Sequence, residues 1–217
     1  IENTLQGLLL EVEQKEIWFR LIGHFNAYNL MAVYASALLL GEEEEAILTE
    51  LSNLSSAAGR FEQFGSPDGI TGIVDYSHTP DALKNVLETI VQIRESSQKV
   101  FTVVGCGGDR DKEKRPKMAR LAYDLSDQAI FTSDNPRSED PLLILEDMKE
   151  GLSPAAQKEV IVIENRQEAI ARACRLAKRG DIVLIAGKGH ETYQEIQGKR
   201  YPFDDREMLK TYLNIED

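Results

Sequence analysis

The stretch VFTVVGCGGD, residues 100–109, decides the fold of this 217-residue chain. Its first half is an apolar run that predicts a strand, and its second half is a glycine-rich turn. The same alternation of short apolar runs with longer helical segments repeats from Arg60 onward. This order is typical of β-α-β units, so the sequence predicts an open α/β domain with a mostly parallel sheet and helices on both faces.

The first 58 residues follow a different pattern. Two apolar runs, residues 8–12 and 17–21, predict a β-hairpin that lacks a sheet of its own. The first helix is expected to be capped by Asn26 and ended by Gly41. The expected strands of the α/β part are 70–75, 100–104, 129–132, 160–163 and 182–186, and the expected helices of the whole chain are 26–40, 42–58, 80–94, 116–125, 141–151 and 167–178.

Composition excludes several classes of protein. The chain has 37 acidic against 25 basic residues and a net charge of −12, the wrong sign for a surface that binds nucleic acid. No apolar run approaches membrane-spanning length and no signal peptide is recognisable, so we expect a cytoplasmic protein that does not bind membranes. The two cysteines lack metal-ligand spacing, and the three histidines occupy separate segments. No metal site is therefore expected.

Four loops that follow predicted strands carry unusual residues, and ligands of such sheets bind at this edge. In the loop at 75–80, Asp75 could hold a ribose or a metal, and Tyr76 and His78 could contact a base or a phosphate; the alternative is a helix cap and turn. In the loop at 105–111, glycines allow positive φ and close backbone approach. Arg110 adds a guanidinium suited to a carboxylate or phosphate; the alternative is a plain tight turn.

The third and fourth loops offer groups of both charges. Asn135 and Arg137 suit an amino acid that carries a carboxylate and an ammonium group, although an Asx-Pro turn explains the same residues. Gly187 brings backbone near a ligand, and Glu191 could receive an ammonium group. Four such loops on one edge of one sheet favour a ligand site over coincidence.

Seven ordered stretches together resemble the Mur ligase family, in its diaminopimelate-adding branch. They are GHFNAYNL (23–30), GRFE (59–62), DYSHTPDAL (75–83), GCGGDRDKEKRP (105–116), DNPR (134–137), GKGHE (187–191) and FDDRE (203–207). The resemblance implies a three-domain, ATP- and Mg²⁺-dependent amide ligase of peptidoglycan biosynthesis. In such a ligase, an acyl phosphate on the D-glutamate side chain of UDP-N-acetylmuramoyl-dipeptide is attacked by an amine that a Rossmann-like C-terminal domain presents.

The resemblance also implies roles for individual residues. The residues implied to hold meso-diaminopimelate are Arg110, Asp134, Asn135, Arg137, Gly187 and Glu191. Those implied to face ATP are Asn29, Arg60, Asp75, Tyr76 and His78.

The chain departs from the family pattern in what it lacks. It contains no phosphate-binding GxxxxGK[ST] loop, no central-domain lysine that the family carbamylates and no magnesium ligands of that domain. We therefore expect residues 1–58 to be the tail of a central ATPase domain and 59–217 to be the amino-acid-binding domain. We expect no catalytic residue in this chain, little ligation by it alone, and a monomer.

Two alternatives remain open from the sequence. One is a stand-alone diaminopimelate-binding module without catalysis. The other is a dinucleotide-dependent oxidoreductase, which β-α-β order alone suggests, but no GxGxxG follows a strand with an acidic residue at suitable spacing.

Overall fold

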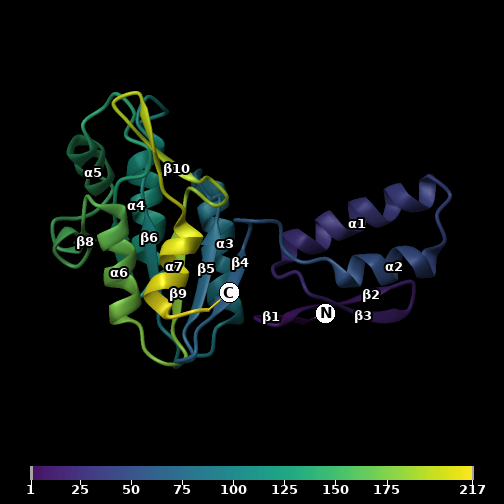
Figure 1. Cartoon of the computed structure of the whole chain (residues 1–217). Helices are drawn as coiled ribbons and strands as arrows, with labels where there is room; N and C mark the ends of the chain where they lie inside the picture. Colours follow the sequence, from purple (N-terminus) through teal and green to yellow (C-terminus); the bar gives the residue numbers. More distant parts are fainter. Residues whose placement is uncertain (1, 217) are drawn as a thin grey trace. The chain divides into compact units, whose positions relative to one another are not determined.

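The computed structural model describes residues 2–216, and the chain divides into two compact units (Figure 1). The N-terminal unit comprises residues 1–57 and 88–95, and the C-terminal unit comprises residues 58–87 and 96–217.

The N-terminal unit contains a small antiparallel sheet and two helices. Strands β2 (Gly7–Val12) and β3 (Lys15–Phe19) form the predicted hairpin. The expectation that this hairpin lacks a sheet was wrong, because β1 (Glu2–Thr4) pairs with β2 and completes three strands. Helices α1 (His24–Leu39) and α2 (Glu44–Asn53) share a core with the sheet. The buried residues of this core are Leu8, Phe19, Leu30, Tyr34, Ile47, Leu48 and Leu51.

The bounds of α1 differ from the prediction by two residues at its start and by one residue at its end. The helix begins two residues before Asn26, and Gly23 is its N-cap with a φ of 92°. Asn26 does not cap the helix, because its side-chain amide donates to the carbonyl of Ile22 at 2.8 Å. Gly41 ends the helix as predicted, with a φ of 88° that favours glycine. The second helix, α2, is shorter than predicted and stops at Asn53.

The C-terminal unit is built on a six-stranded sheet in the order β4-β5-β9-β6-β7-β8. All five predicted strands are present, and the bounds of β6 (Val100–Val104) and β9 (Ile182–Ala186) are as predicted. These two strands are completely buried, which explains their continuous apolar sequences. The other strands are β4 (Glu62–Gly65), β5 (Thr71–Asp75), β7 (Gln128–Phe131) and β8 (Ile161–Val162), and only β4 is antiparallel to its neighbour.

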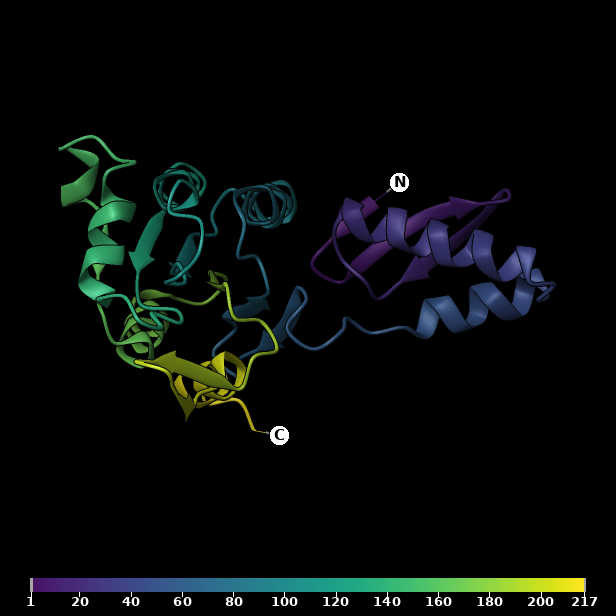
Figure 2. The same cartoon turned by 90° about the horizontal axis from the view of Figure 1, so that it is seen from above.

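Helices cover both faces of this sheet, which confirms the predicted fold class. Helices α6 (Arg166–Leu176) and α7 (Asp205–Leu213) pack on the face that presents Val103, Val183 and Ile185. Figure 2 shows α4 and the start of α3 on the other face. The remaining helix bounds are α3 (Pro80–Ile93), α4 (Lys114–Asp124), α5 (Pro141–Lys149) and the short 3-10 turn η1 (Ala156–Lys158).

Besides the 3-10 turn η1, three strands and one α-helix of the C-terminal unit were not predicted. They are the edge strand β4, the hairpin of β10 (Tyr193–Ile196) with β11 (Lys199–Pro202), and helix α7. None of the helices in the described part of the chain has the length and apolar content needed to span a lipid bilayer.

Candidate functional site

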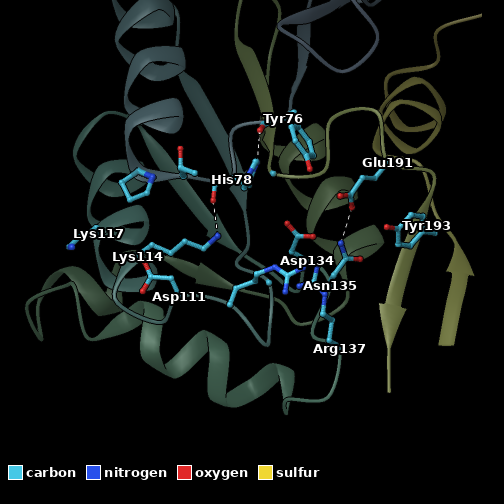
Figure 3. Close-up of a pocket in the computed structure, with 15 residues that line it drawn as sticks. Tyr76, His78, Asp111, Lys114, Lys117, Asp134, Asn135, Arg137, Glu191 and Tyr193 are labelled. Carbon is cyan, nitrogen blue, oxygen red and sulfur yellow. Dashed lines mark hydrogen bonds between the residues drawn. The ribbon is translucent and has the colours of Figure 1, made fainter. Parts of the chain in front are cut away.

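A pocket of about 530 Å³ lies at the carboxyl ends of the parallel strands (Figure 3). The chain passes from β5 through β6 and β7 to β8, and then returns to insert β9 between β5 and β6. Such a reversal of strand order separates the loops on either side and leaves a crevice for ligands. The pocket is lined by Tyr76, His78, Thr79, Pro80, Gly107, Arg110, Asp111, Lys114, Lys117, Asp134, Asn135, Arg137, Gly187, Glu191 and Tyr193.

A cluster of four polar side chains forms one wall of the pocket and the layer behind it. The amide nitrogen of Asn135 donates to Glu191 Oε2 at 2.8 Å. The ammonium group of Lys188 donates to Asn135 Oδ1 at 2.9 Å and to Glu191 Oε2 at 3.1 Å, and it lies 3.6 Å from Asp134 Oδ1. Burial raises the pKa of Glu191, but these hydrogen bonds and the charges of Lys188 and Arg137 lower it below its ordinary value. Glu191 is therefore a carboxylate at neutral pH.

The backbone of Arg137 is held in an unusual conformation. Its φ of 52° lies in the left-handed region, which costs energy for a residue other than glycine. The hairpin β10–β11 fixes this conformation, because Arg137 N donates to Glu195 O at 3.0 Å and Gln197 N donates to Arg137 O at 2.7 Å. One terminal nitrogen of the guanidinium donates to Gly108 O at 2.7 Å, and Nε lies 3.7 Å from a carboxylate oxygen of Glu195. The guanidinium thus spans the pocket wall between two loops.

The glycine-rich loop is shaped by the loop that follows β7. A Cβ on Gly108 would lie 2.0 Å from Pro136 O, and one on Gly107 would lie 2.8 Å from a guanidinium nitrogen of Arg137. The predicted close backbone approach is confirmed, but it is to the neighbouring loop. The predicted positive φ falls on Asp109 (52°), and the three glycines of this turn do not adopt one.

A buried arginine below this loop ties it to the segment that follows β7. Arg115 makes two hydrogen bonds to the carboxylate of Glu139, at 2.8 and 3.0 Å, and a third to Asp147 at 2.7 Å. Glu139 also accepts from the backbone N–H of Asp109 at 2.6 Å. These contacts, with the Arg115 hydrogen bonds first, lower the pKa of Glu139 to about 2.

The wall on the α4 side is basic. Among the residues that the structure describes, Arg110 donates a hydrogen bond only to the adjacent carbonyl of Asp109, at 3.0 Å. Its guanidinium therefore has donors left for a ligand. Lys114 Nζ donates to His78 O at 2.8 Å, and Lys117 lies one helical turn further along α4. Lys114 and Lys117 were not predicted to line the site, although their spacing at the start of a helix after the glycine loop was a usable signal.

Aromatic rings gather where the loop after β5 meets the loop after β9. The ring of Tyr76 lies 4.6 Å from that of His78 and 5.0 Å from that of His190. The guanidinium carbon of Arg60 lies 4.7 Å from the centre of the Tyr76 ring, a cation–π distance. Asp75 is buried behind this group, where its carboxylate accepts from Phe61 N at 2.8 Å and burial raises its pKa.

The structure brings together most of the residues that the sequence singled out. The six residues expected to hold diaminopimelate, with Tyr76 and His78, line the one pocket described above. Arg60 stacks on Tyr76, whereas Asp75 does not line the pocket. Asn29 belongs to the N-terminal unit, where it is exposed and donates to Asn26 Oδ1 at 3.1 Å. Within residues 2–216, no group of three or more His, Cys, Asp or Glu side chains is arranged to hold a metal ion.

The fold and the pocket define an open α/β domain with a polar pocket at the switch point of its sheet. A family model described as "Mur ligase, glutamate ligase domain" matches residues 59–189, and the chain belongs to the Mur ligase family. This family consists of ATP-dependent ligases.

Curated relatives match almost the whole chain. A protein of Cytophaga hutchinsonii named UDP-N-acetylmuramoyl-L-alanyl-D-glutamate--2,6-diaminopimelate ligase is 56% identical over 214 residues, which are 99% of this chain and 44% of the relative. The protein of the same name from Bacillus velezensis is 48% identical over 212 residues, which are 96% of this chain and 42% of the relative. This chain therefore spans less than half the length of these relatives.

Solved structures agree with the fold. A structure of a UDP-N-acetylmuramoyl-L-alanyl-D-glutamate--2,6-diaminopimelate ligase is 40% identical with a TM-score of 0.72, and the match covers 98% of this chain and 44% of that one. A folylpolyglutamate synthase of Mycobacterium tuberculosis, 19% identical with a TM-score of 0.66 over 86% of this chain and 44% of that one, shares the fold.

Proposed function

We propose that this chain is the C-terminal part of an ATP-dependent ligase that adds meso-diaminopimelate to UDP-N-acetylmuramoyl-L-alanyl-D-glutamate in peptidoglycan biosynthesis. Its role in that reaction is to hold diaminopimelate and present the attacking amine. The observation that carries the proposal is the pocket itself, in which three loops place two arginines, an amide and the carboxylate of Glu191 around one cavity. The names of the relatives at 56% and 48% identity support the same reaction.

The chemistry of the pocket suits a ligand with two amino-acid heads. Arg137 and Asn135 offer donors to a carboxylate, and Glu191 offers its Oε1 to an ammonium group because Asn135 and Lys188 both donate to Oε2. Arg110 stands on the opposite loop and can receive a second carboxylate. Lysine lacks that second carboxylate, so it would forgo the charge-assisted hydrogen bonds to the exposed guanidinium of Arg110 and bind more weakly.

We assign the two parts of the chain to two domains of the parent ligase, with a boundary between residues 58 and 59. The apolar surface of α1 supports this assignment for the first part. Tyr28, Met31, Val33 and Leu39 are all exposed, and Leu39 is 89% exposed. A helix that is apolar on most of its faces belongs inside a larger core than the N-terminal unit provides.

We assign Arg60, Tyr76 and His78 to contacts with ATP, and extend the assignment to Asp75 and Asn29. The stacked guanidinium and rings fit a base or a phosphate. Asp75 would act indirectly, because its carboxylate accepts a hydrogen bond from the backbone N–H of Phe61, next to Arg60. ATP would supply the phosphoryl group that activates the D-glutamate carboxyl. The described residues form no metal site, so the ligands of Mg²⁺ would lie in the rest of the parent enzyme. A cytoplasmic location and a monomeric state belong to the same proposal.

Calorimetric titration of this chain with meso-diaminopimelate, and separately with L-lysine, tests the pocket. We expect diaminopimelate to bind and lysine to bind at least about 10-fold more weakly, because lysine forgoes hydrogen bonds between charged groups that are worth about 1.5–3 kcal/mol. Arg137→Ala should abolish binding, and Arg172→Ala, an exposed arginine outside the pocket, should leave it unchanged. Equal binding of the two amino acids would refute the assigned specificity.

Catalysis is tested separately. The isolated chain is expected to release no phosphate from ATP when precursor, diaminopimelate and Mg²⁺ are present, because phosphoryl transfer needs a phosphate-binding loop that its sequence does not contain. Phosphate release above the rate of a boiled control would contradict this expectation.

A further inference from the structure

Lys188 is buried directly behind the wall of the pocket. It lies between Gly187, which lines the pocket, and Gly189, and its side chain is 0% exposed. Lys188 itself is not among the described residues that line the cavity. A lysine is almost never fully buried unless it is paired, so the placement of this side chain needs an explanation.

The partners of Lys188 are the residues proposed to read the amino-acid head. Its three ammonium hydrogens face three acceptors: Asn135 Oδ1 at 2.9 Å, Glu191 Oε2 at 3.1 Å and Asp134 Oδ1 at 3.6 Å. The ring of Tyr193 closes the remaining side, with its centre 5.6 Å from the nitrogen. One buried cation thus contacts two of the carboxylates that line the pocket, Asp134 and Glu191, and the amide of Asn135.

These contacts fix the direction of the Asn135 amide. Oδ1 accepts from Lys188 and from the backbone N–H of Glu195 at 2.9 Å, so the carbonyl end must face away from the cavity. The NH₂ end is then left to face Glu191, to which it donates at 2.8 Å. An amide turned the other way would set its NH₂ group against an ammonium, where no acceptor exists.

The same contacts orient Glu191. Both Asn135 and Lys188 donate to Oε2, which leaves Oε1 without a contact among residues 2–216 and available to an ammonium group of the ligand. Without the lysine, the carboxylates of Asp134 and Glu191 would keep Arg137 and the buried Arg166 as the cations near them, with the phenols of Tyr76 and Tyr193 beside them.

We propose that Lys188 is a positioning residue of the diaminopimelate pocket, which holds Asn135 and Glu191 in the arrangement that receives the amino-acid head without contacting the ligand. This inference rests on the proposed function. The inference extends the proposed function to Lys188, a residue that does not line the pocket.

Two substitutions separate charge from hydrogen bonding. Lys188→Met removes both in a side chain of similar length, and Lys188→Gln retains an N–H donor without the charge. Lys158→Met is the matched control, because it removes one positive charge from an exposed site outside the pocket. Thermal unfolding followed by circular dichroism establishes that each variant is folded.

Two readouts are taken on the folded variants. The first is the affinity for meso-diaminopimelate by calorimetry across pH. The second is NMR of the ligand-free chain, which follows the Asn135 side-chain amide and the titration of the Glu191 carboxyl. We expect Lys188→Met to weaken binding at least about 10-fold and to raise the pKa of Glu191, so that binding is lost on acidification at a higher pH than in wild type. Lys158→Met should match wild type in both readouts.

The outcomes separate this inference from the proposed function. If wild type binds meso-diaminopimelate and both Lys188 variants bind it with the affinity of wild type, the inference is wrong and the proposed function stands. If wild type does not bind, the proposed pocket fails in this chain. The inference is then decided by NMR: it survives when Lys188→Met shifts the Asn135 amide and the Glu191 titration, and falls when neither changes. If neither variant folds, Lys188 supports the fold and not the pocket, and the inference is wrong.

Discussion

Replacing Asp205 with asparagine removes the charge that compensates a completely buried arginine. Arg166 begins α6 and Asp205 begins α7, and the side chains of both are 0% exposed. Nε and one terminal nitrogen of Arg166 donate to the two carboxylate oxygens at 2.7 Å each, and that terminal nitrogen also donates to Ala186 O at 3.1 Å. The pair joins two helices to the end of β9, one residue before Gly187 of the pocket.

The loss of free energy of unfolding follows from these contacts. Removing one partner of a buried pair leaves an uncompensated charge and costs about 3–5 kcal/mol. Two hydrogen bonds to a charged group, at about 1.5–3 kcal/mol each, give about 3–6 kcal/mol, which overlaps this range. The second terminal nitrogen of Arg166 is buried without a hydrogen-bond partner in the described structure, so the carbonyl of Ala186 is the one partner there that the substitution leaves unaltered. The loss is large against a total domain stability of about 5–15 kcal/mol.

Urea unfolding followed by circular dichroism measures this loss. Trp18 is the sole tryptophan and belongs to the N-terminal unit, so its fluorescence reports on that unit, and the circular dichroism transition is expected to move further. Glu146→Gln is the control, because Glu146 is 64% exposed in its pair with Lys149 and should contribute less than about 0.5 kcal/mol. A loss below about 1 kcal/mol in Asp205→Asn would refute the reasoning.

Three further predictions concern the loops around the pocket and the thiols. The low pKa of Glu139, about 2, means that its pairing with Arg115 stabilises the fold above the ordinary carboxyl pKa and that this contribution is lost as pH falls towards 2. Urea unfolding should therefore find Glu139→Gln less stable by about 2 kcal/mol at pH 7, with a difference from wild type that shrinks below pH 5; a constant difference would contradict this. Gly108→Ala should abolish binding of meso-diaminopimelate in calorimetry, since the new Cβ would lie 2.0 Å from a carbonyl oxygen of the next loop, and unchanged affinity would show that this loop yields. Cys106 and Cys174 are buried and their thiol pKa is raised to about 12, so a thiol reagent should label neither until denaturant is added; rapid labelling of the native chain would disprove their burial.

The strands that the sequence predicted best are those whose own residues carry a clear apolar pattern. The strands β6 and β9 are buried on both faces, so a continuous apolar run suffices to define them. The edge strand β4 is half-buried and its sequence, EQFG, has no apolar run or alternation to reveal it. The hairpin β10–β11 is mostly polar, and its one local signal was the turn at Gln197 and Gly198, whose φ values of 49° and 71° fit a tight hairpin turn.

The same distinction holds for the candidate site. The loops were predicted because each follows a strand and carries residues that suit a ligand, as Arg110 and Glu191 do. The position of Lys188 could not be predicted, because its burial depends on Asn135 from another loop and on Tyr193 from an unpredicted hairpin. Sequence reasoning therefore found groups that line the pocket and missed the buried cation that contacts them.

The central position of β9 has a consequence for synthesis of the protein. This strand is the last of the six along the chain, yet it is hydrogen-bonded to both β5 and β6. While β9 is still inside the ribosome, the emerged chain contains two fragments of the sheet, β4–β5 and β6–β7–β8. Each fragment has an unpaired edge where β9 will later bind. During that interval the chain is exposed to mispairing with other chains, and the pocket is incomplete until the residues up to Tyr193 have emerged.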